Sequence, residues 1–221
     1  MKISSNLIVV CGHYGTGKTN FSLNLAVDFA GRGEQVTLCD LDIVNPFFRV
    51  SDFPEVAQSA GIELITPSYS RSNIDVPSLP AAMDSITERP GRVIVDVGGD
   101  DAGSTALGRY SRRIAAGDYA MLLVINRYRA LSVTAEETAE LLREIEAASR
   151  LRATGIINNS HLMELTTPET IIESIPYAEA VAGLTGLPVM ATAAERRLIP
   201  ALEGRIDDLY PMDVYVKPVW K

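Results

Sequence analysis

Residues 7–19 read LIVVCGHYGTGKT, an apolar run followed by a glycine-rich turn and a Lys-Thr pair. The spacing of Gly12 from Gly17, Lys18 and Thr19 matches the phosphate-loop pattern GxxxxGK[ST], and the apolar run predicts a strand that leads into the loop. Glycines let backbone N–H groups turn inward around a phosphate, Lys18 can reach the outer phosphates, and the Thr19 hydroxyl can bind Mg²⁺. A helix beginning near Lys18 would direct its positive N-terminal dipole at the same anion. The stretch therefore predicts a nucleotide-binding loop between a strand and a helix.

The composition of the chain is that of a folded protein without a strongly basic surface. Its 221 residues are 47% hydrophobic and 6% aromatic, which suits one domain over residues 1–221 with a full hydrophobic core. There are 28 acidic and 20 basic residues, and the net charge of −8 disfavours a broad nucleic-acid-binding surface. The apolar runs are too short to span a bilayer, so we expect a soluble cytoplasmic protein without a membrane anchor.

Apolar runs and helical patterns alternate along the chain, which predicts a mainly parallel sheet with helices on both faces. We expect strands over residues 7–10, 36–39, 62–65, 92–97, 119–125, 154–157 and 187–190. We expect helices after Lys18, over 79–86, over 102–115, after a capping box at Thr134 and Glu137, after Thr167, and over 194–202.

Acidic residues stand at the ends of two of these strands. Asp40 and Asp42 follow the strand over 36–39, and Asp96 lies near the end of the strand over 92–97. In an open parallel sheet, ligands bind at the carboxyl ends of the strands, so these carboxylates are expected beside the phosphate loop. Phosphoryl transfer needs Mg²⁺ and a group that orients the attacking water, and acids in this position can serve both needs.

The sequence resembles the MinD/ParA family of P-loop ATPases, part of the CobQ/CobB/MinD/ParA group related to the nitrogenase iron protein, over nearly the whole chain. The resemblance is carried by GHYGTGKT at 12–19, DLD at 40–42, DVGG at 96–99 and GIINN at 155–159. It implies a single-domain α/β P-loop NTPase that binds ATP with Mg²⁺ and hydrolyses ATP slowly.

The resemblance also implies a role for each matching residue. The loop residues implied to bind the nucleotide are Gly12, His13, Tyr14, Gly15, Thr16, Gly17, Lys18, Thr19 and Asn20, and of these Gly15, Gly17, Lys18 and Thr19 would bind phosphates and Mg²⁺. Lys18 and Asp42 would be the catalytic residues, and Asp42 would help to position the hydrolytic water. Thr19, Asp40 and Asp96 would form the magnesium site, with Asp96 acting through water.

Further positions would respond to the nucleotide or read its base. Gly99 would be the phosphate-sensing hinge of the second switch loop. Asn159 would read adenine, with Asn158 as an equally polar neighbour, and the backbone after Pro188 would line the other side of the base. The guanine-reading motif NKxD is absent, so we expect adenine as the base.

The phosphate loop departs from the family pattern at two positions. The family reads KGGxGKT, with a first lysine that reaches the phosphate of a dimer partner, whereas this chain has His13 and Tyr14 at the first two positions. Between Ile3 and Val216 the single lysine is Lys18, so such a cation would have to be His13 or an arginine. His13 either contacts phosphate, within its own chain or across a dimer, or faces solvent.

The expected function is an ATPase switch that acts on a protein partner, which the motifs do not identify. Nucleotide state would move the loops at 42–50 and 98–105, and ATP would favour a homodimer. One alternative is a small-molecule ligase or kinase related to dethiobiotin or cobyrinate amidating synthetases, with the segment 66–77 shaping a substrate pocket. The other is an interaction module that binds nucleotide and hydrolyses it weakly or not at all, because the first loop lysine is missing.

Overall fold

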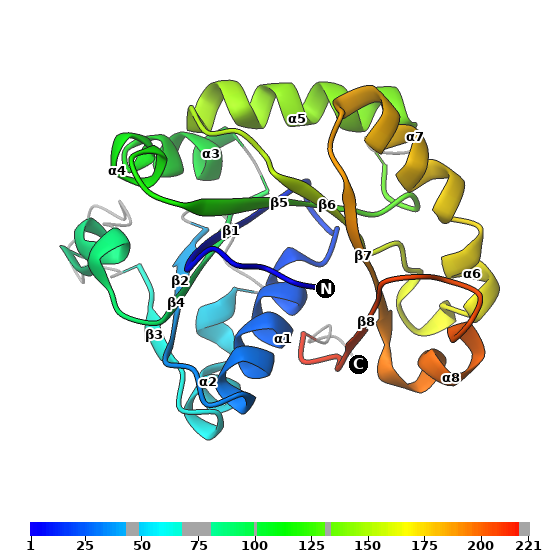
Figure 1. The fold of residues 1–221 in the computed structure, drawn as a ribbon, viewed down its shortest axis with the longest axis horizontal. Helices are drawn as coiled ribbons and strands as arrows, with labels where there is room; N and C mark the ends of the chain where they lie inside the picture. The colour runs from blue at the N-terminus through cyan, green and yellow to red at the C-terminus, as the bar shows by residue number, and fades with distance from the viewer. Residues whose placement is uncertain (43–48, 68–80, 100, 131–133, 217–221) are drawn as a thin grey trace, which may run out of the picture.

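One sheet of parallel strands organises the structure, a computed structural model that describes residues 1–42, 49–67, 81–99, 101–130 and 134–216. Within these residues the sheet has eight strands in the order β3-β2-β4-β1-β5-β6-β7-β8, and every neighbouring pair is parallel (Figure 1). The strands are β1 (Leu7–Cys11), β2 (Val36–Leu41), β3 (Glu63–Ile65), β4 (Arg92–Val97), β5 (Tyr119–Ile125), β6 (Gly155–Asn158), β7 (Val189–Glu195) and β8 (Leu209–Met212). The α/β class and the parallel sheet expected from the sequence are confirmed.

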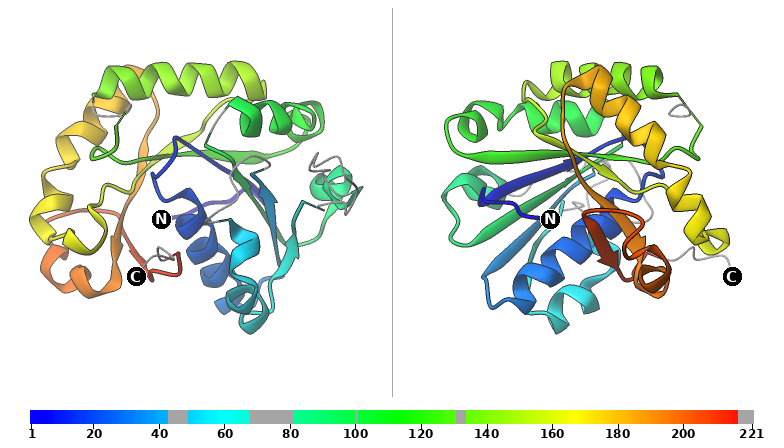
Figure 2. Two further views of the ribbon diagram at one scale, coloured as in Figure 1. Left: turned by 180° about the vertical axis from the view of Figure 1, so that it is seen from behind. Right: turned by 45° about the vertical axis from the view of Figure 1, so that its right-hand side comes forward.

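Helices cover both faces of the sheet, as Figure 1 and Figure 2 show from three directions. One face carries α1 (Lys18–Gly31) and α2 (Pro54–Ser59). The other carries α3 (Asp101–Gly108), α4 (Ser111–Ala115), α5 (Ala135–Ser149) and α7 (Ile175–Thr185). The shorter α6 (Pro168–Ile172) and α8 (Ile199–Leu202) lie near β7 and β8. In the described ranges, no helix is long and apolar enough to cross a membrane.

The strand before the phosphate loop is buried along its whole length because both of its faces are covered. Leu7, Val9 and Cys11 join the apolar layer beneath α3, α5 and α7. Ile8 and Val10 point to the opposite layer, where they pack with the apolar face of α1. A strand buried on both faces has no polar side to alternate with, which explains the continuous apolar run in the sequence.

Local sequence signals account for where several helices begin and end. Thr134 caps α5: its hydroxyl accepts from the Glu137 backbone N–H at 3.2 Å, and the Glu137 carboxylate accepts from the Thr134 N–H at 3.0 Å. Pro168 occupies the first turn of α6 behind the cap Thr167. After α1 the chain turns at Gly33, whose φ is 82°. The capping box and the start of α6 expected from the sequence are confirmed.

The carboxyl-terminal part of the sheet differs from the sequence expectation. The last expected strand, over 187–190, runs instead from Val189 to Glu195, so the expected helix over 194–202 is reduced to a 3-10 turn, η4 (Arg196–Leu198), followed by α8. The residues MATAAE of β7 have little intrinsic strand preference, and pairing with β6 and β8 overrides it. The strand β8 was not expected at all.

Two expected helices also differ in form. The helix expected over 102–115 is divided into α3 and α4 at Arg109 and Tyr110. The helix expected over 79–86 is a 3-10 helix, η2 (Ala81–Glu88). The shorter 3-10 turns are η1 (Val50–Asp52) and η3 (Met163–Leu165). Residues 43–48 of the expected first switch loop, and 68–77 of the segment assigned to a substrate pocket, lie outside the described residues.

Candidate nucleotide-binding site

The phosphate loop joins β1 to α1 at the carboxyl edge of the sheet, where ligands bind in folds of this kind. Gly12 begins the loop with a φ of 142°, and a Cβ built there would lie 2.3 Å from the Val124 carbonyl oxygen. Only glycine allows the chain to leave β1 this close to β5. The loop therefore begins against the two central strands of the sheet.

The lysine and threonine of the loop hold one of its own carbonyl groups. The His13 carbonyl oxygen accepts from Lys18 Nζ and from Thr16 Oγ1, each at 2.9 Å. Lys18 is buried, and its ammonium lies 5.9 Å from the centre of the Tyr14 ring, which is partly exposed at the outer end of the loop. Lys18 is thus held at the centre of the loop, where a phosphate would meet it.

A buried carboxylate lies beside the start of α1. The Asp96 side chain, in β4, accepts from Thr19 Oγ1 at 2.7 Å and from Ser22 Oγ at 2.9 Å. Burial raises the pKa of Asp96 to about 7, against the opposing effects of the Lys18 charge and the two hydroxyls. A carboxylate held like this in an apolar surrounding gains from a bound cation. Asp96 and Thr19 thus form a pair of hard oxygen ligands of the kind that Mg²⁺ prefers.

Asp40 lies next to Asp96 on the neighbouring strand, since the two residues are register partners between β2 and β4. Asp40 is fully buried, and burial raises its pKa. One carboxylate oxygen accepts from the Asp42 backbone N–H at 3.0 Å, and the other accepts from the Ser51 backbone N–H at 3.3 Å. Asp40 thereby fixes the chain on both sides of residues 43–48. The half-buried Asp42 stands at the end of the strand, on the edge that carries the loop.

The second expected switch loop begins in close contact with the phosphate loop. A Cβ built on Gly99 would lie 2.8 Å from the Tyr14 backbone nitrogen and 2.9 Å from Lys18 Nζ. Only a glycine fits between them without displacing the loop. Residue 100 lies outside the described residues, and α3 begins at Asp101.

Asn159, at the end of β6, faces the phosphate loop. Its side-chain Nδ2 donates to the Thr16 carbonyl oxygen at 2.7 Å, and its own backbone N–H donates to Ile125. The neighbouring Asn158 turns into the interior, where its amide donates to Ser174 Oγ at 2.9 Å. Of the two asparagines, Asn159 is the one that the fold brings to the loop.

Two of the expected site residues do not face the loop. The Pro188 carbonyl accepts from the Ile156 backbone N–H at 2.9 Å, at the amino edge of the sheet. Because β7 starts at Val189, Pro188 precedes the strand instead of following it, and the expectation that the backbone after it lines the base is corrected. The Asn20 side chain binds the carboxyl-terminal segment, donating to the Asp213 carbonyl at 3.0 Å and accepting from the Tyr215 N–H at 2.9 Å.

Three residues near the loop were missed from the sequence. Ser22 contacts Asp96, as described above, and Arg129 Nε donates to the Gly15 carbonyl oxygen at 2.8 Å. His161 lies beside Gly17, and burial, helped by the Arg129 charge, lowers its pKa to about 4. Arg129 follows β5 and His161 follows β6. The rule that carboxyl ends of parallel strands meet at one edge would have indicated both.

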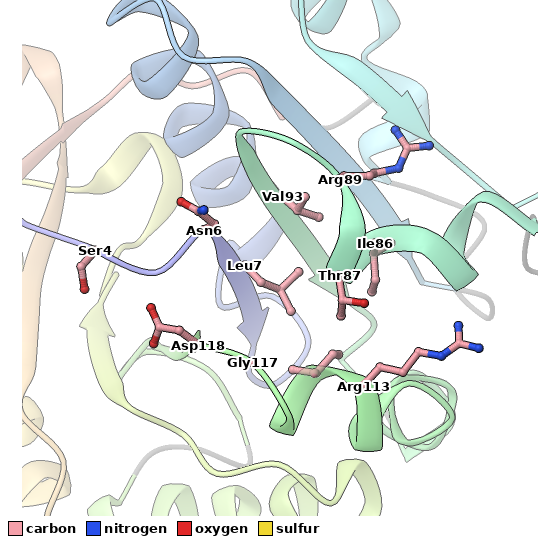
Figure 3. A pocket seen from close by; sticks show the side chains of 11 residues that line it. Ser4, Asn6, Leu7, Ile86, Thr87, Arg89, Val93, Arg113, Gly117 and Asp118 are labelled. Carbon is pink, nitrogen blue, oxygen red and sulfur yellow. The ribbon is translucent and has the colours of Figure 1, made fainter.

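A separate pocket lies at the opposite edge of the sheet. Its volume is about 270 Å³, and Leu7 and Val93, at the amino ends of β1 and β4, form part of its wall (Figure 3). Arg89 and Arg113 lie at its rim, where Arg89 pairs with Glu63 at 2.7 Å. Because the loop leaves the other end of β1, this pocket is not part of the nucleotide site.

Comparison with known families gives a match at the same residues. The model of the CobQ/CobB/MinD/ParA nucleotide binding domain matches residues 7–189, which include the phosphate loop, Asp40, Asp96 and Asn159. No curated protein matches the sequence significantly.

Several solved structures have a similar fold, and three of them are compared with this chain. The signal recognition particle receptor FtsY from Elizabethkingia anophelis in complex with GDP is 16% identical with a TM-score of 0.54, over 87% of this chain and 58% of that one. The cell division protein FtsY from Thermotoga maritima is 21% identical with a TM-score of 0.52, over 96% and 67%. The signal recognition particle 54 kDa protein from Aeropyrum pernix K1 in complex with GDP is 18% identical with a TM-score of 0.56, over 87% and 42%. This chain thus spans less than two thirds of the first of these, and the similarity concerns the fold.

Proposed function

The chain belongs to the CobQ/CobB/MinD/ParA family of nucleotide-binding domains, and from that premise we propose that it is a Mg²⁺-dependent ATPase switch that acts on a protein partner in the cytoplasm. The observation that supports this best is the cluster at the start of α1. There Lys18 lies inside the phosphate loop, and the Thr19 hydroxyl meets the buried Asp96 carboxylate at 2.7 Å. These groups suit a triphosphate and its metal.

Thr19 and Asp96 fit a magnesium ion by their chemistry. Both are oxygen ligands, and Mg²⁺ in phosphate sites takes one or two protein oxygens and completes its shell with water and phosphate oxygens. In this proposal Thr19 would bind the ion directly, Asp96 would hold it through water, and Asp40 would add negative charge from the next strand. When bound, a magnesium ion neutralises part of the negative charge on the phosphates.

The remaining groups of the site would bind and orient the reactants. Lys18 would exchange the His13 carbonyl for an outer phosphate oxygen, and the loop N–H groups would surround the phosphates. Asp42 would orient the attacking water from the end of β2. Its backbone is held by Asp40, so the position of this carboxylate depends on a buried anchor. Asn159 would read adenine, after releasing the Thr16 carbonyl that it now contacts.

The described ends of both proposed switch loops lie beside the phosphate loop, which supports a nucleotide-driven switch. Asp40 holds the chain at Asp42 and at Ser51, on either side of the first loop. Gly99, at the start of the second loop, lies against Tyr14 and Lys18. Movement of Lys18 toward a terminal phosphate would therefore change the packing around Gly99. A protein partner or a second copy of the chain would read the change.

The test is nucleotide binding and product analysis on the purified chain. We expect ATP to bind more tightly than GTP, to require Mg²⁺, and to be hydrolysed slowly to ADP and phosphate. In Asp42→Ala, turnover should fall while ATP binding is kept. Tighter binding of GTP would contradict the choice of base, and binding of neither nucleotide would overturn the proposal.

Two further outcomes would favour the alternatives. A phosphorylated product formed only with an added small molecule would indicate a ligase or kinase. Tight ATP binding with turnover equal to that of Asp42→Ala would indicate a binding module that does not hydrolyse nucleotide.

A further inference from the structure

Arg129 lies against the outer side of the phosphate loop. Its Nε donates to the Gly15 carbonyl oxygen at 2.8 Å. A Cβ built on Gly15 would lie 3.0 Å from Nε and 3.2 Å from the guanidinium carbon, so the planar group covers this part of the loop. Arg129 comes from the segment after β5, while the loop comes from β1. The contact therefore joins two central strands at their carboxyl edge.

The contact fixes the direction of the loop backbone. Side chains from outside the loop hold two of its carbonyls: the Gly15 carbonyl accepts from Arg129, and the Thr16 carbonyl accepts from Asn159. A peptide whose carbonyl is held outward has its N–H directed the other way. Convergent N–H groups of this kind are what bind phosphate in such loops. Among these donors outside the loop itself, Arg129 is charged and Asn159 is neutral.

The guanidinium also brings a fixed positive charge to the loop. Lys18 lies on the inner side and Arg129 on the outer side, and the chain has no other lysine between Ile3 and Val216. The neighbouring His161 is half-buried, and its pKa of about 4 keeps it neutral at pH 7. Arg129 thus carries the positive charge on this side of the loop, while His161 adds none.

We propose that Arg129 is a positioning residue for the outer phosphates of the bound nucleotide: it holds the Gly15 carbonyl outward and adds positive charge beside the loop. This rests on the proposed function, because it assumes that the loop binds a nucleotide. The role is distinct from holding the fold together, since a neutral donor could hold Gly15 but could not attract additional phosphate charge.

The same turn offers a matched control. Arg127, two residues earlier, donates to the Glu173 carbonyl and lies 5.9 Å from the centre of the Tyr128 ring, so its guanidinium is engaged away from the loop. Arg127→Gln removes one positive charge from the same segment without touching Gly15. Arg129→Gln keeps a hydrogen-bond donor and removes the charge, while Arg129→Lys keeps the charge.

The experiment is calorimetric titration of wild type and the three variants with AMP, ADP and ATP in Mg²⁺, with thermal melting to confirm folding. We expect Arg129→Gln to weaken ATP binding by about tenfold, because one positive charge beside the outer phosphates is lost, with a smaller effect on ADP and the smallest on AMP. Arg129→Lys should retain most of the preference for ATP, and Arg127→Gln should match wild type.

If Arg129→Gln weakened the binding of all three nucleotides equally, or if Arg127→Gln weakened ATP binding as much, the role proposed for Arg129 would be overturned. The proposed function would not be affected by either result. Wild-type protein that binds none of the three nucleotides would overturn both this inference and the proposed function.

Discussion

The buried Asp96 carboxylate reduces the stability of the nucleotide-free protein, and in the proposed function it helps to bind the metal ion of the nucleotide. Its carboxylate is buried between β4 and α1, with hydroxyl donors on both oxygens. Two hydroxyls do not replace the water that an ionised carboxylate loses on burial, and the pKa rises to about 7. The nearby Asp40 adds to this rise, so two acids on adjacent strands favour a cation at this point.

The first prediction concerns the pH dependence of stability. An unfolded aspartate has a pKa of roughly 3.9, so the folded chain, with Asp96 at about 7, binds this proton more tightly. The stability that this proton binding adds to the folded state is therefore fully present below about pH 4, and it is lost as the pH rises through about 7. Asp96→Asn should raise the free energy of unfolding of the nucleotide-free protein at pH 8, by on the order of 2 kcal/mol, and less at pH 5.

Urea denaturation at both pH values, with and without Mg-ATP, checks this. Burial also raises the pKa of Asp40, so the difference between wild type and variant reports Asp96 together with its interaction with Asp40. With Mg-ATP the order should reverse, because wild type gains stability from the ligand and the variant does not. A variant less stable than wild type at pH 8 without ligand would contradict the prediction.

At the scale of elements, the site is made where four strand ends converge. The loop leaves β1, Asp96 lies in β4, Asp40 in β2, and Asn159 follows β6. The segment after β4 packs so closely on the loop that Gly99 has no room for a side chain. A displacement of the loop would therefore push against this segment, which is the physical basis of the proposed second switch.

Gly99→Ala tests this close packing. Its Cβ would have to displace the Tyr14 backbone, and overpacking of this kind costs about 1–3 kcal/mol of stability. We expect weaker ATP binding together with this loss, because the displaced backbone belongs to the phosphate loop. The control is Gly183→Ala in α7, where a Cβ meets nothing within 4 Å.

Gly183→Ala should leave ATP binding unchanged and be neutral or stabilising by up to about 1 kcal/mol, since alanine lowers the entropy of the unfolded chain. Thermal melting and ATP titration of both variants measure the two effects. If Gly99→Ala bound ATP with the same affinity as wild type, the contact between the second switch and the loop would not contribute to ATP binding.

At the scale of the whole molecule, the carboxyl-terminal segment is tied to the helix that carries the site. Asn24 of α1 donates to the Asp213 carbonyl at 2.8 Å and accepts from the Asp213 N–H at 2.7 Å. Asn20, one turn earlier, binds the backbone of Tyr215 and Val216. The first two turns of α1 therefore join the phosphate loop to the segment that follows β8, the strand at one edge of the sheet.

The prediction at this scale is the oligomeric state. If the proposed switch works across two chains, sedimentation velocity should show a dimer with Mg-ATP and a monomer with Mg-ADP or no nucleotide. In Asp42→Ala the dimer should persist, because the ATP is not consumed. A chain that binds ATP and stays monomeric in all states would exclude a homodimer, and a separate protein partner would have to read the switch.

Sequence alone determined the fold class, the phosphate loop and the acids beside it. The reason is physical: strands buried on both faces must be apolar throughout, and a phosphate loop needs glycines, a lysine and a hydroxyl at fixed spacing. The same local logic predicted the capping of α5 by Thr134. The resemblance assigned Asn159 to reading adenine, which stays a prediction, and the structure shows its side chain in contact with Thr16 of the loop.

Only the tertiary structure decided which distant residues meet the loop. The rule on strand ends places Arg129 and His161 at this edge of the sheet. They reach the loop because β5 lies beside β1 and β6 beside β5, an order of strands that no spacing in the sequence encodes. Pro188 was expected near the base but precedes β7. The alanine-rich β7 has weak local strand preference, so its extent is set by pairing with its neighbours, and the pairing partner β8 was missed. Local patterns specify elements whose burial or turn chemistry is written in adjacent residues, whereas contacts between strand ends depend on the order of the strands in the sheet.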